Sequence, residues 1–363
     1  MNQETTDAKR ARKGRWRLMA GVGFGVVLAG GLAFVALVPR DPMFHGKRES
    51  EWVTNIVYGM SLSETQNKEQ VQRWRDFGPE GLRVLERGLA ANRAPKYRNA
   101  YDRLAKSLPN GLMRLLPAPP PKTVGGTRHI VADLLCRMGT NAHPAWPAVA
   151  RALSDEDPWV RSRAVTFFTQ PEDDKAFLNQ LPAQEKKKLL PQFIRAVEDG
   201  GWCWNLRNNA ALALKYYPEA ASLVAPPLVN ALKDASPYVR LSAADALNRV
   251  DPVAGSKAGA VSVVSNLLQS PDYQISGDAA RALREFQHDA DAAVAALIGA
   301  LEGTNRSVVG ASAVWSLEWA FPDHTNRTIP ALKKAAETQD NAGNYARSAV
   351  RALESGRRVV RRQ

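Results

Sequence analysis

Cysteine and histidine are scarce in this chain of 363 residues. Its two cysteines, Cys136 and Cys203, are too few and too far apart for a disulfide framework. Each is expected to serve as a small apolar side chain. The five histidines show no ligand spacing with the cysteines, so no metal site is predicted.

Known catalytic motifs are also missing. No Gly-x-Ser-x-Gly occurs, and neither cysteine lies near a histidine in a recognisable motif. The glycine-rich segment 21–25 follows no strand, which argues against a nucleotide-binding loop. We therefore expect no catalytic residues and no cofactor, and predict that the protein is not an enzyme.

Leu18–Val38 forms 21 consecutive residues without a charge. Because a helix of ~20 apolar residues crosses a bilayer, this run predicts a transmembrane anchor at 18–38. Six basic residues lie before it in 1–17, so the N-terminus is expected in the cytoplasm and the rest outside, in the periplasm if the protein is bacterial. The alternative is a cleaved signal peptide, although the apolar core of such a peptide usually has only ~7–15 residues.

The net charge of +13 is concentrated at the two ends. The first 38 residues hold six basic and two acidic groups, and the tail 357–363 holds four arginines. The charges before the apolar run set topology, and the body of the chain is only mildly basic. No nucleic-acid partner is expected.

Between its ends the chain divides by composition. Residues 39–116 are predicted to form a lead-in and a small helical region, and 117–126 a proline- and glycine-rich linker. The main body, 127–356, repeats itself: short alanine-rich helices close on an apolar residue at intervals of 33 to 46 residues. These residues define repeats one to seven and are, in order, Leu135, Phe168, Leu214, Leu247, Leu283, Leu317 and Leu353. Such a period is typical of a stacked array and favours binding over catalysis.

Two of the repeats share a signature at the turn before the second helix. Asp155 precedes Arg161 by six residues, and Asp234 precedes Arg240 by six. Each pair is predicted to have a structural capping or ion-pairing role. With the segments DPWVR (157–161) and SPYVR (236–240), this pattern resembles HEAT repeats. In repeats three, five and six the aspartate is replaced by Gly201, Ser270 and Thr304. In repeats five, six and seven the arginine is replaced by Ser276, Gly310 and Ala346. The aspartate–arginine ladder is therefore expected to be broken in repeats three, five, six and seven.

The resemblance implies an all-α, right-handed α-α solenoid of HEAT-like helical hairpins, here preceded by one transmembrane helix. Counted from the closing residue, positions −9, −5, −2 and +2 of each second helix share one face, which the resemblance makes concave. The face is mostly polar and is predicted to bind a protein partner. Its predicted binding residues are Trp159, Arg163, Tyr216, Tyr238, Asp245, Arg249, Arg281, Trp315, Trp319 and Arg351.

Repeat six departs from the polar pattern, because Trp315 and Trp319 occupy positions that are mostly charged elsewhere. Exposed aromatics on such a face indicate a partner-binding patch. Two alternatives are that a C-terminal element covers the pair, or that repeat six is rotated in its stack.

The sequence thus predicts a membrane-tethered, non-enzymatic HEAT-repeat scaffold that binds a protein partner through its concave face. One alternative is a HEAT-like enzyme of the lyase or DNA-glycosylase type, which would need a pocket built from groups such as Asp245 and Asp278. Another is a structural envelope protein.

Overall fold

The computed structural model describes residues 42–56, 62–90, 125–170, 176–303 and 306–355. These residues form two compact units. The first comprises the described residues up to Gln70 and from Arg83 to Val131, and the second comprises Val71–Leu82 and the described residues from Ala132 onward. α3 (Glu64–Asp76), α4 (Gly78–Ala90) and α7 (Gly125–Met138) each contribute to both units.

The first unit opens with a small hairpin that the all-helical prediction does not include. β1 (Met43–Phe44) pairs antiparallel with β2 (Lys47–Arg48). His45 and Gly46 both have positive φ, as a tight two-residue hairpin turn requires. α2 (Glu49–Thr54) follows, and Trp52 Nε1 donates to the Phe44 carbonyl at 2.7 Å, which fixes the hairpin to the helix.

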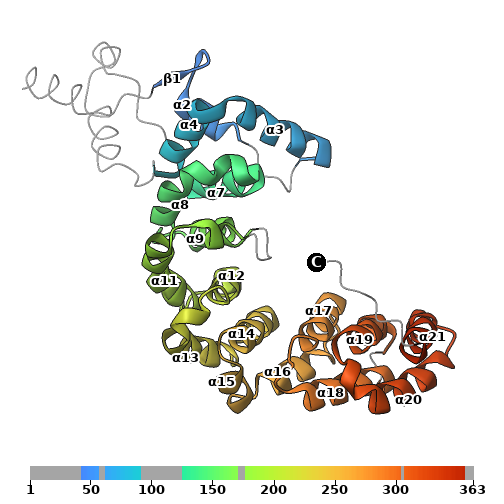
Figure 1. The fold of residues 1–363 in the computed structure, drawn as a ribbon. Helices are drawn as coiled ribbons and strands as arrows, with labels where there is room; N and C mark the ends of the chain where they lie inside the picture. Colours follow the sequence, from blue (N-terminus) through green and yellow to red (C-terminus); the bar gives the residue numbers. More distant parts are fainter. Residues whose placement is uncertain (1–41, 57–61, 91–124, 171–175, 304–305, 356–363) are drawn as a thin grey trace, which may run out of the picture. The chain divides into compact units, whose positions relative to one another are not determined.

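The second unit is a two-layered stack of helix pairs (Figure 1). The layer of first helices consists of α8 (Trp146–Ala152), α11 (Ala183–Val197), α13 (Ala221–Ala231), α16 (Ala260–Leu267), α18 (Ala290–Glu302) and α20 (Thr325–Ala336). The layer of second helices consists of α9 (Pro158–Thr169), α12 (Trp204–Leu214), α14 (Pro237–Val250), α17 (Tyr273–Leu283), α19 (Arg306–Ala320) and α21 (Asn341–Glu354). Short elements connect them: η2 (Gly139–Ala145), α10 (Phe177–Gln180), η3 (Pro218–Ala220), α15 (Pro252–Lys257) and η4 (Pro322–His324).

The structure changes two predictions made from the sequence, one about the end of the linker and one about membrane location. α7 begins at Gly125, inside the segment predicted as a linker up to residue 126. The predicted single-pass membrane location is corrected, because no described helix is long and apolar enough to cross a membrane. The longest described helices, α11 and α19, have 15 residues each, against the ~20 that a crossing needs. The segments 1–17, 18–38 and 357–363 lie outside the described residues.

The core of the stack is built from the residues that define the repeat period. All the closing residues from Leu135 to Leu317 are at most 1% exposed. Around them the second helices bury small side chains, such as Ala164, Ala210 and Ala280, which let neighbouring helices approach closely. Two prolines open second helices where their missing N–H is harmless, because α9 begins at Pro158 and α14 at Pro237.

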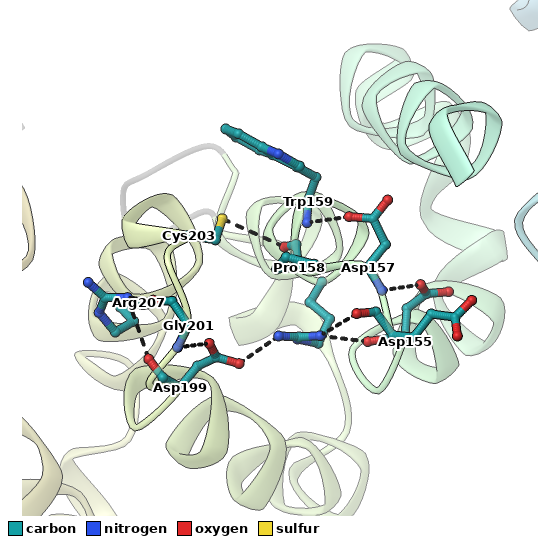
Figure 2. A network of polar contacts seen from close by, with 10 residues as sticks. Asp155, Asp157, Pro158, Trp159, Asp199, Gly201, Cys203 and Arg207 are labelled. Atoms are coloured by element: carbon teal, nitrogen blue, oxygen red, sulfur yellow. Dashed lines mark hydrogen bonds and ion pairs between the residues drawn. The ribbon is translucent and has the colours of Figure 1, made fainter. Parts of the chain in front are cut away.

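A ladder of arginines and aspartates connects the turns between first and second helices, and Figure 2 shows the part of it around Asp155 and Asp199. Arg161 Nη2 lies 2.6 Å from Asp199 Oδ2 in the next repeat. Arg207 Nε lies 2.6 Å from Asp234 Oδ2 in the repeat after that. The ladder therefore ties repeats two, three and four to one another through their turns.

The same turns are stabilised from within. Oδ1 of Asp155, of Asp199 and of Asp234 each accepts a hydrogen bond at 2.8 Å from the backbone N–H two residues later. The arginines donate back to turn carbonyls: Arg161 to Asp155 O at 2.8 Å and Arg240 to Asp234 O at 2.7 Å. The turns of the ladder are thus closed by hydrogen bonds from their own aspartates and are joined to the turns of adjacent repeats by ion pairs.

This geometry corrects the predicted pairs. Arg161 contacts the carbonyl oxygen of Asp155, and Arg240 that of Asp234. The ion pairs of Arg161 with Asp199 and of Arg207 with Asp234 instead join successive repeats. The ladder predicted to break in repeat three is intact, because Asp199 lies two residues before Gly201 and supplies the carboxylate.

Repeats five and seven hold their turns in other ways. In repeat five, Ser276 Oγ donates to Asp272 O at 3.1 Å from the position where an arginine would stand. In repeat seven, Arg347 donates to the carbonyls of Ala336 and Thr338, although the sequence alignment placed Ala346 at this position.

Asp234 makes the ladder sensitive to pH. Burial acts to raise the pKa of its carboxyl, but hydrogen bonds from Arg207 and from the Ser236 amide, with the charges of Arg207 and Arg240, lower it below its ordinary value. A carboxyl with a depressed folded-state pKa stabilises the fold above its unfolded pKa of ~3.9, and this stabilisation disappears as the pH falls through the folded value.

We expect Asp234→Asn to lower the free energy of unfolding by about 2 kcal/mol at pH 7, since it removes charge-assisted hydrogen bonds from the half-buried Arg207. The difference from wild type should be smaller at pH 3 than at pH 7, because below ~3.9 protonation of this carboxyl in the unfolded chain already favours unfolding of the wild type. Urea unfolding at both pH values measures this. Asp278→Asn, which removes a more exposed partner of Arg281, is the control and should change stability by about 0.5 kcal/mol or less. A deficit equal at both pH values would show that the charge of Asp234 is not what stabilises the turn.

Candidate functional site on the face of the second helices

The described second helices present one row of side chains away from the first helices. Tyr238 and Asp245 on α14 are half-buried, and Arg249 is exposed at its end. Arg281 on α17 and Arg351 on α21 are also exposed. These residues lie where the sequence register placed them, although the structure does not test whether they bind a partner.

Trp315 and Trp319 lie one turn apart on α19, with 41% and 37% of their surface exposed. Their ring centroids are 6.0 Å apart at an interplanar angle of 49°. No described C-terminal element buries them. Between them Ser316 is fully buried, and its Oγ donates to the Ala280 carbonyl of α17 at 2.8 Å. This bond fixes the rotation of α19 and therefore the outward direction of both indoles.

Arg284 belongs to the same patch but was missed from the sequence. Its guanidinium lies 5.2 Å from the centroid of the Trp315 ring, within the range of a cation–π interaction. Its Nε also lies 2.8 Å from Glu285 Oε1. Arg284 directly follows the closing Leu283, a position outside the register chosen for the face. We call Arg284, Trp315 and Trp319 the tryptophan–arginine patch.

Two carboxyls near the patch have raised pKa values. Burial raises the pKa of Asp245, and the charge of Glu285 adds to this, while Lys215, Arg249 and Arg284 oppose it. Burial also raises the pKa of Glu318, which neighbours Trp319 in sequence. The patch therefore combines apolar rings, cations and poorly solvated carboxyls.

One predicted binding residue is wrong. Tyr216 is only 4% exposed. Tyr216 lies two residues after the closing Leu214. In repeat four the corresponding position still belongs to α14. In repeat three α12 ends at Leu214, so Tyr216 lies in the following turn. The side chain therefore points into the stack, under Lys215.

The remaining predicted residues lie nearer the start of the array and are partly engaged. Arg163 Nε lies 3.2 Å from Oδ1 of the buried Asp133, which also pairs with Arg137 at 2.7 Å. Trp159 is half-buried, and its ring lies 5.6 Å from that of Trp202. These contacts keep Arg163 and Trp159 on the face but remote from the patch on α19.

A cavity among the described residues lies elsewhere, at the ladder. It measures about 310 Å³ and lies between repeats three and four. Its charged lining consists of Glu198, Asp199, Arg207 and Asp234. The last three form the ladder ion pairs, so the cavity is part of the structural turns. In the described residues no group of histidines, cysteines and carboxylates is arranged to hold a metal ion.

The HEAT repeat family pattern matches residues 224–254, which cover most of α13, the Asp234 turn and the whole of α14. The chain is a HEAT-repeat protein. The match falls on the repeat in which Asp234, Pro237 and Arg240 together show the complete turn signature. A comparison with curated protein sequences finds no match.

Several solved structures resemble this HEAT-repeat protein weakly. An engineered protein is 18% identical, with a TM-score of 0.42 over 85% of this chain and 92% of that chain. The CpcE–CpcF complex of phycocyanin lyase from Nostoc sp. PCC7120 is 17% identical, with a TM-score of 0.37 over 64% and 91%. A designed armadillo repeat protein is 18% identical, with a TM-score of 0.35 over 64% and 95%. At these low scores, nothing about those proteins is carried over.

The exposure of the tryptophans predicts a modest contribution to folding. We expect Trp315→Ala to lower the free energy of unfolding by about 1 kcal/mol or less, because much of the ring faces solvent. Phe321→Ala, at a ring in the same repeat that is only 2% exposed, should cost about 3–5 kcal/mol. Urea unfolding of both variants measures the two values. Equal losses of unfolding free energy in the two variants would show that Trp315 is a core residue and would contradict the assignment of an exposed tryptophan–arginine patch.

Proposed function

We propose that this HEAT-repeat protein is a non-enzymatic scaffold that binds a protein partner through the face of its second helices, in a right-handed stack of helix pairs. The observation that carries the proposal is the exposed pair Trp315 and Trp319 on α19. Large aromatic side chains left partly in water are costly for the free protein, and partner surfaces are where they are commonly used.

The patch is also preorganised for binding. The buried Ser316 hydrogen bond sets the orientation of α19, and Arg284 lies against the Trp315 ring. Because these side chains are already held in place, the patch loses less conformational entropy when a partner docks. An interface centred on the two indoles would therefore gain most of its affinity from a small area.

The charged side chains around the patch would determine which partners bind. Arg249, Arg281 and Glu285 are exposed, and the half-buried Asp278 pairs with Arg281. Such mixed rim charges contribute to specificity and association rate more than to affinity. A partner surface with an apolar centre and charges of both signs around it fits this arrangement.

The test uses a photo-crosslinking amino acid at Arg281 in the full chain, with the same amino acid at Lys187, an exposed position on first helix α11, as the control. We expect a specific partner to be cross-linked from position 281 and not from 187. The double change Trp315→Ala and Trp319→Ala should then weaken its binding by ~2 kcal/mol or more. Leu223→Ala, at an exposed apolar side chain on α13, should leave binding unchanged. Equal cross-linking from both positions, or unchanged affinity in the double variant, would contradict the proposal.

A further inference from the structure

A second group of aromatic side chains lies at the N-terminal ends of the second helices. Trp159 stands in the first turn of α9, Trp204 at the start of α12 with Trp202 two residues before it, Tyr238 in the first turn of α14, and Tyr273 at the start of α17. We call these five residues the aromatic edge. Four successive repeats contribute to it, and it is separate from the tryptophan–arginine patch.

Side-chain contacts connect neighbouring repeats along the edge. The rings of Trp159 and Trp202 are 5.6 Å apart at 64°, and those of Trp204 and Tyr238 are stacked at 4.8 Å and 16°. The Tyr238 hydroxyl donates to Asp272 Oδ2 at 3.0 Å, and Asp272 directly precedes Tyr273. These contacts, and the proximity of Trp202 to Trp204 in the chain, link the edge from repeat two to repeat five.

Much of this row faces solvent. Trp202 is 69% exposed and Tyr273 is 76% exposed, the highest values among the large apolar side chains described. Neither side chain contributes substantially to the core of the stack. The fold itself therefore gives no reason for aromatic residues at these two positions.

The charges along the edge have one dominant sign. The four turn segments 154–160, 198–206, 233–239 and 269–275 hold seven carboxylates and one lysine. The arginines that follow them are engaged: Arg161 and Arg207 in the ladder pairs, and Arg240 with turn carbonyls. Even with these three counted, negative charge is in excess. Asp272 lies fully at the surface, where hydrogen bonds led by that from the Gln274 amide lower its pKa and keep it ionised.

We propose that the aromatic edge binds an extended peptide segment rich in arginine and lysine. A guanidinium or ammonium group is attracted both to the face of an aromatic ring and to a nearby carboxylate, and this edge places both along one row. In a chain of net charge +13, the local excess of carboxylates gives such a cationic segment a defined place to bind.

The size of the row sets the length of the ligand. Four neighbouring helices packed roughly 8–10 Å apart span on the order of 30 Å. An extended chain covers about 3.3 Å per residue, so roughly nine residues reach from Trp159 to Tyr273. An acidic segment would be repelled, and a neutral sugar would leave the carboxylates unmatched.

The experiment measures fluorescence anisotropy of a labelled nine-residue peptide of alternating arginine and serine, titrated with the full chain. We expect saturable binding that weakens as salt is added, and no binding of the same peptide with glutamate in place of arginine. Trp202→Ala combined with Tyr273→Ala should weaken binding about tenfold, since it removes two cation–π contacts. Asp272→Asn, which retains a capping side chain, should weaken binding and reduce its salt dependence.

The matched control is the double change Trp315→Ala and Trp319→Ala, which should leave peptide affinity unchanged because those indoles belong to the other patch. Circular dichroism melting checks that each variant is folded, and Tyr273→Ala alone carries the test if the double edge variant is not. Absence of saturable binding, equal binding of the glutamate peptide, tighter binding of a neutral chitooligosaccharide, or an effect only in the Trp315/Trp319 variant would each overturn the proposal. Since the peptide assay needs no natural partner, its failure would leave the proposed scaffold function standing.

Discussion

Close stacking of the second helices is the constraint on which the rest of this structure depends. Their facing sides carry small residues, and polar side chains reach across the joints. Asn209 Nδ2 donates to Ser162 Oγ at 3.1 Å, and Ser242 Oγ donates to Asn208 Oδ1 at 2.7 Å. A larger side chain at these positions would separate the helices and break the bonds. Because each second helix is held on two sides, its remaining outward face is fixed, and that face is where the candidate site lies.

The same constraint explains why charges gather at the turns. The ladder of Arg161, Asp199, Arg207 and Asp234 joins repeats at their ends, where partial exposure keeps the cost of desolvating ion pairs low. The helices themselves pack through apolar and small residues and through uncharged polar side chains such as Asn209 and Ser162. The ion pairs that join the repeats therefore lie at the turns. The face of the second helices remains available for aromatic side chains and for charged groups that could contact a partner.

The sequence predicts the parts of this structure that depend on period alone. The closing residues, from Leu135 to Leu317, are buried because every repeat needs the same apolar contact, and a repeated need leaves a repeated pattern. Pro158 and Pro237 mark helix starts for a local steric reason that also survives in sequence. The exposure of Trp315 and Trp319 follows from the register of the neighbouring repeats.

The features that the sequence does not predict depend on helix and turn lengths, which vary between repeats. α12 ends early, so Tyr216 turns inward although its register position is outward in repeat four. Asp199 takes its place in the ladder across a spacing two residues longer than in repeats two and four, and a fixed spacing cannot find it. Arg284 was missed because it contacts Trp315 on α19, the second helix of the following repeat, and only the packing of α17 on α19 brings the two together.

Oxidative footprinting of side chains, followed by mass spectrometry on the full chain with and without its cross-linked partner, tests the central claim most directly. In the free protein Trp315, Trp319 and the 65% exposed Met43 should all be oxidised. In the complex both tryptophans should become protected while Met43 keeps its reactivity. Unchanged oxidation of Trp315 and Trp319 in a saturated complex would contradict the claim that the face of the second helices binds the partner.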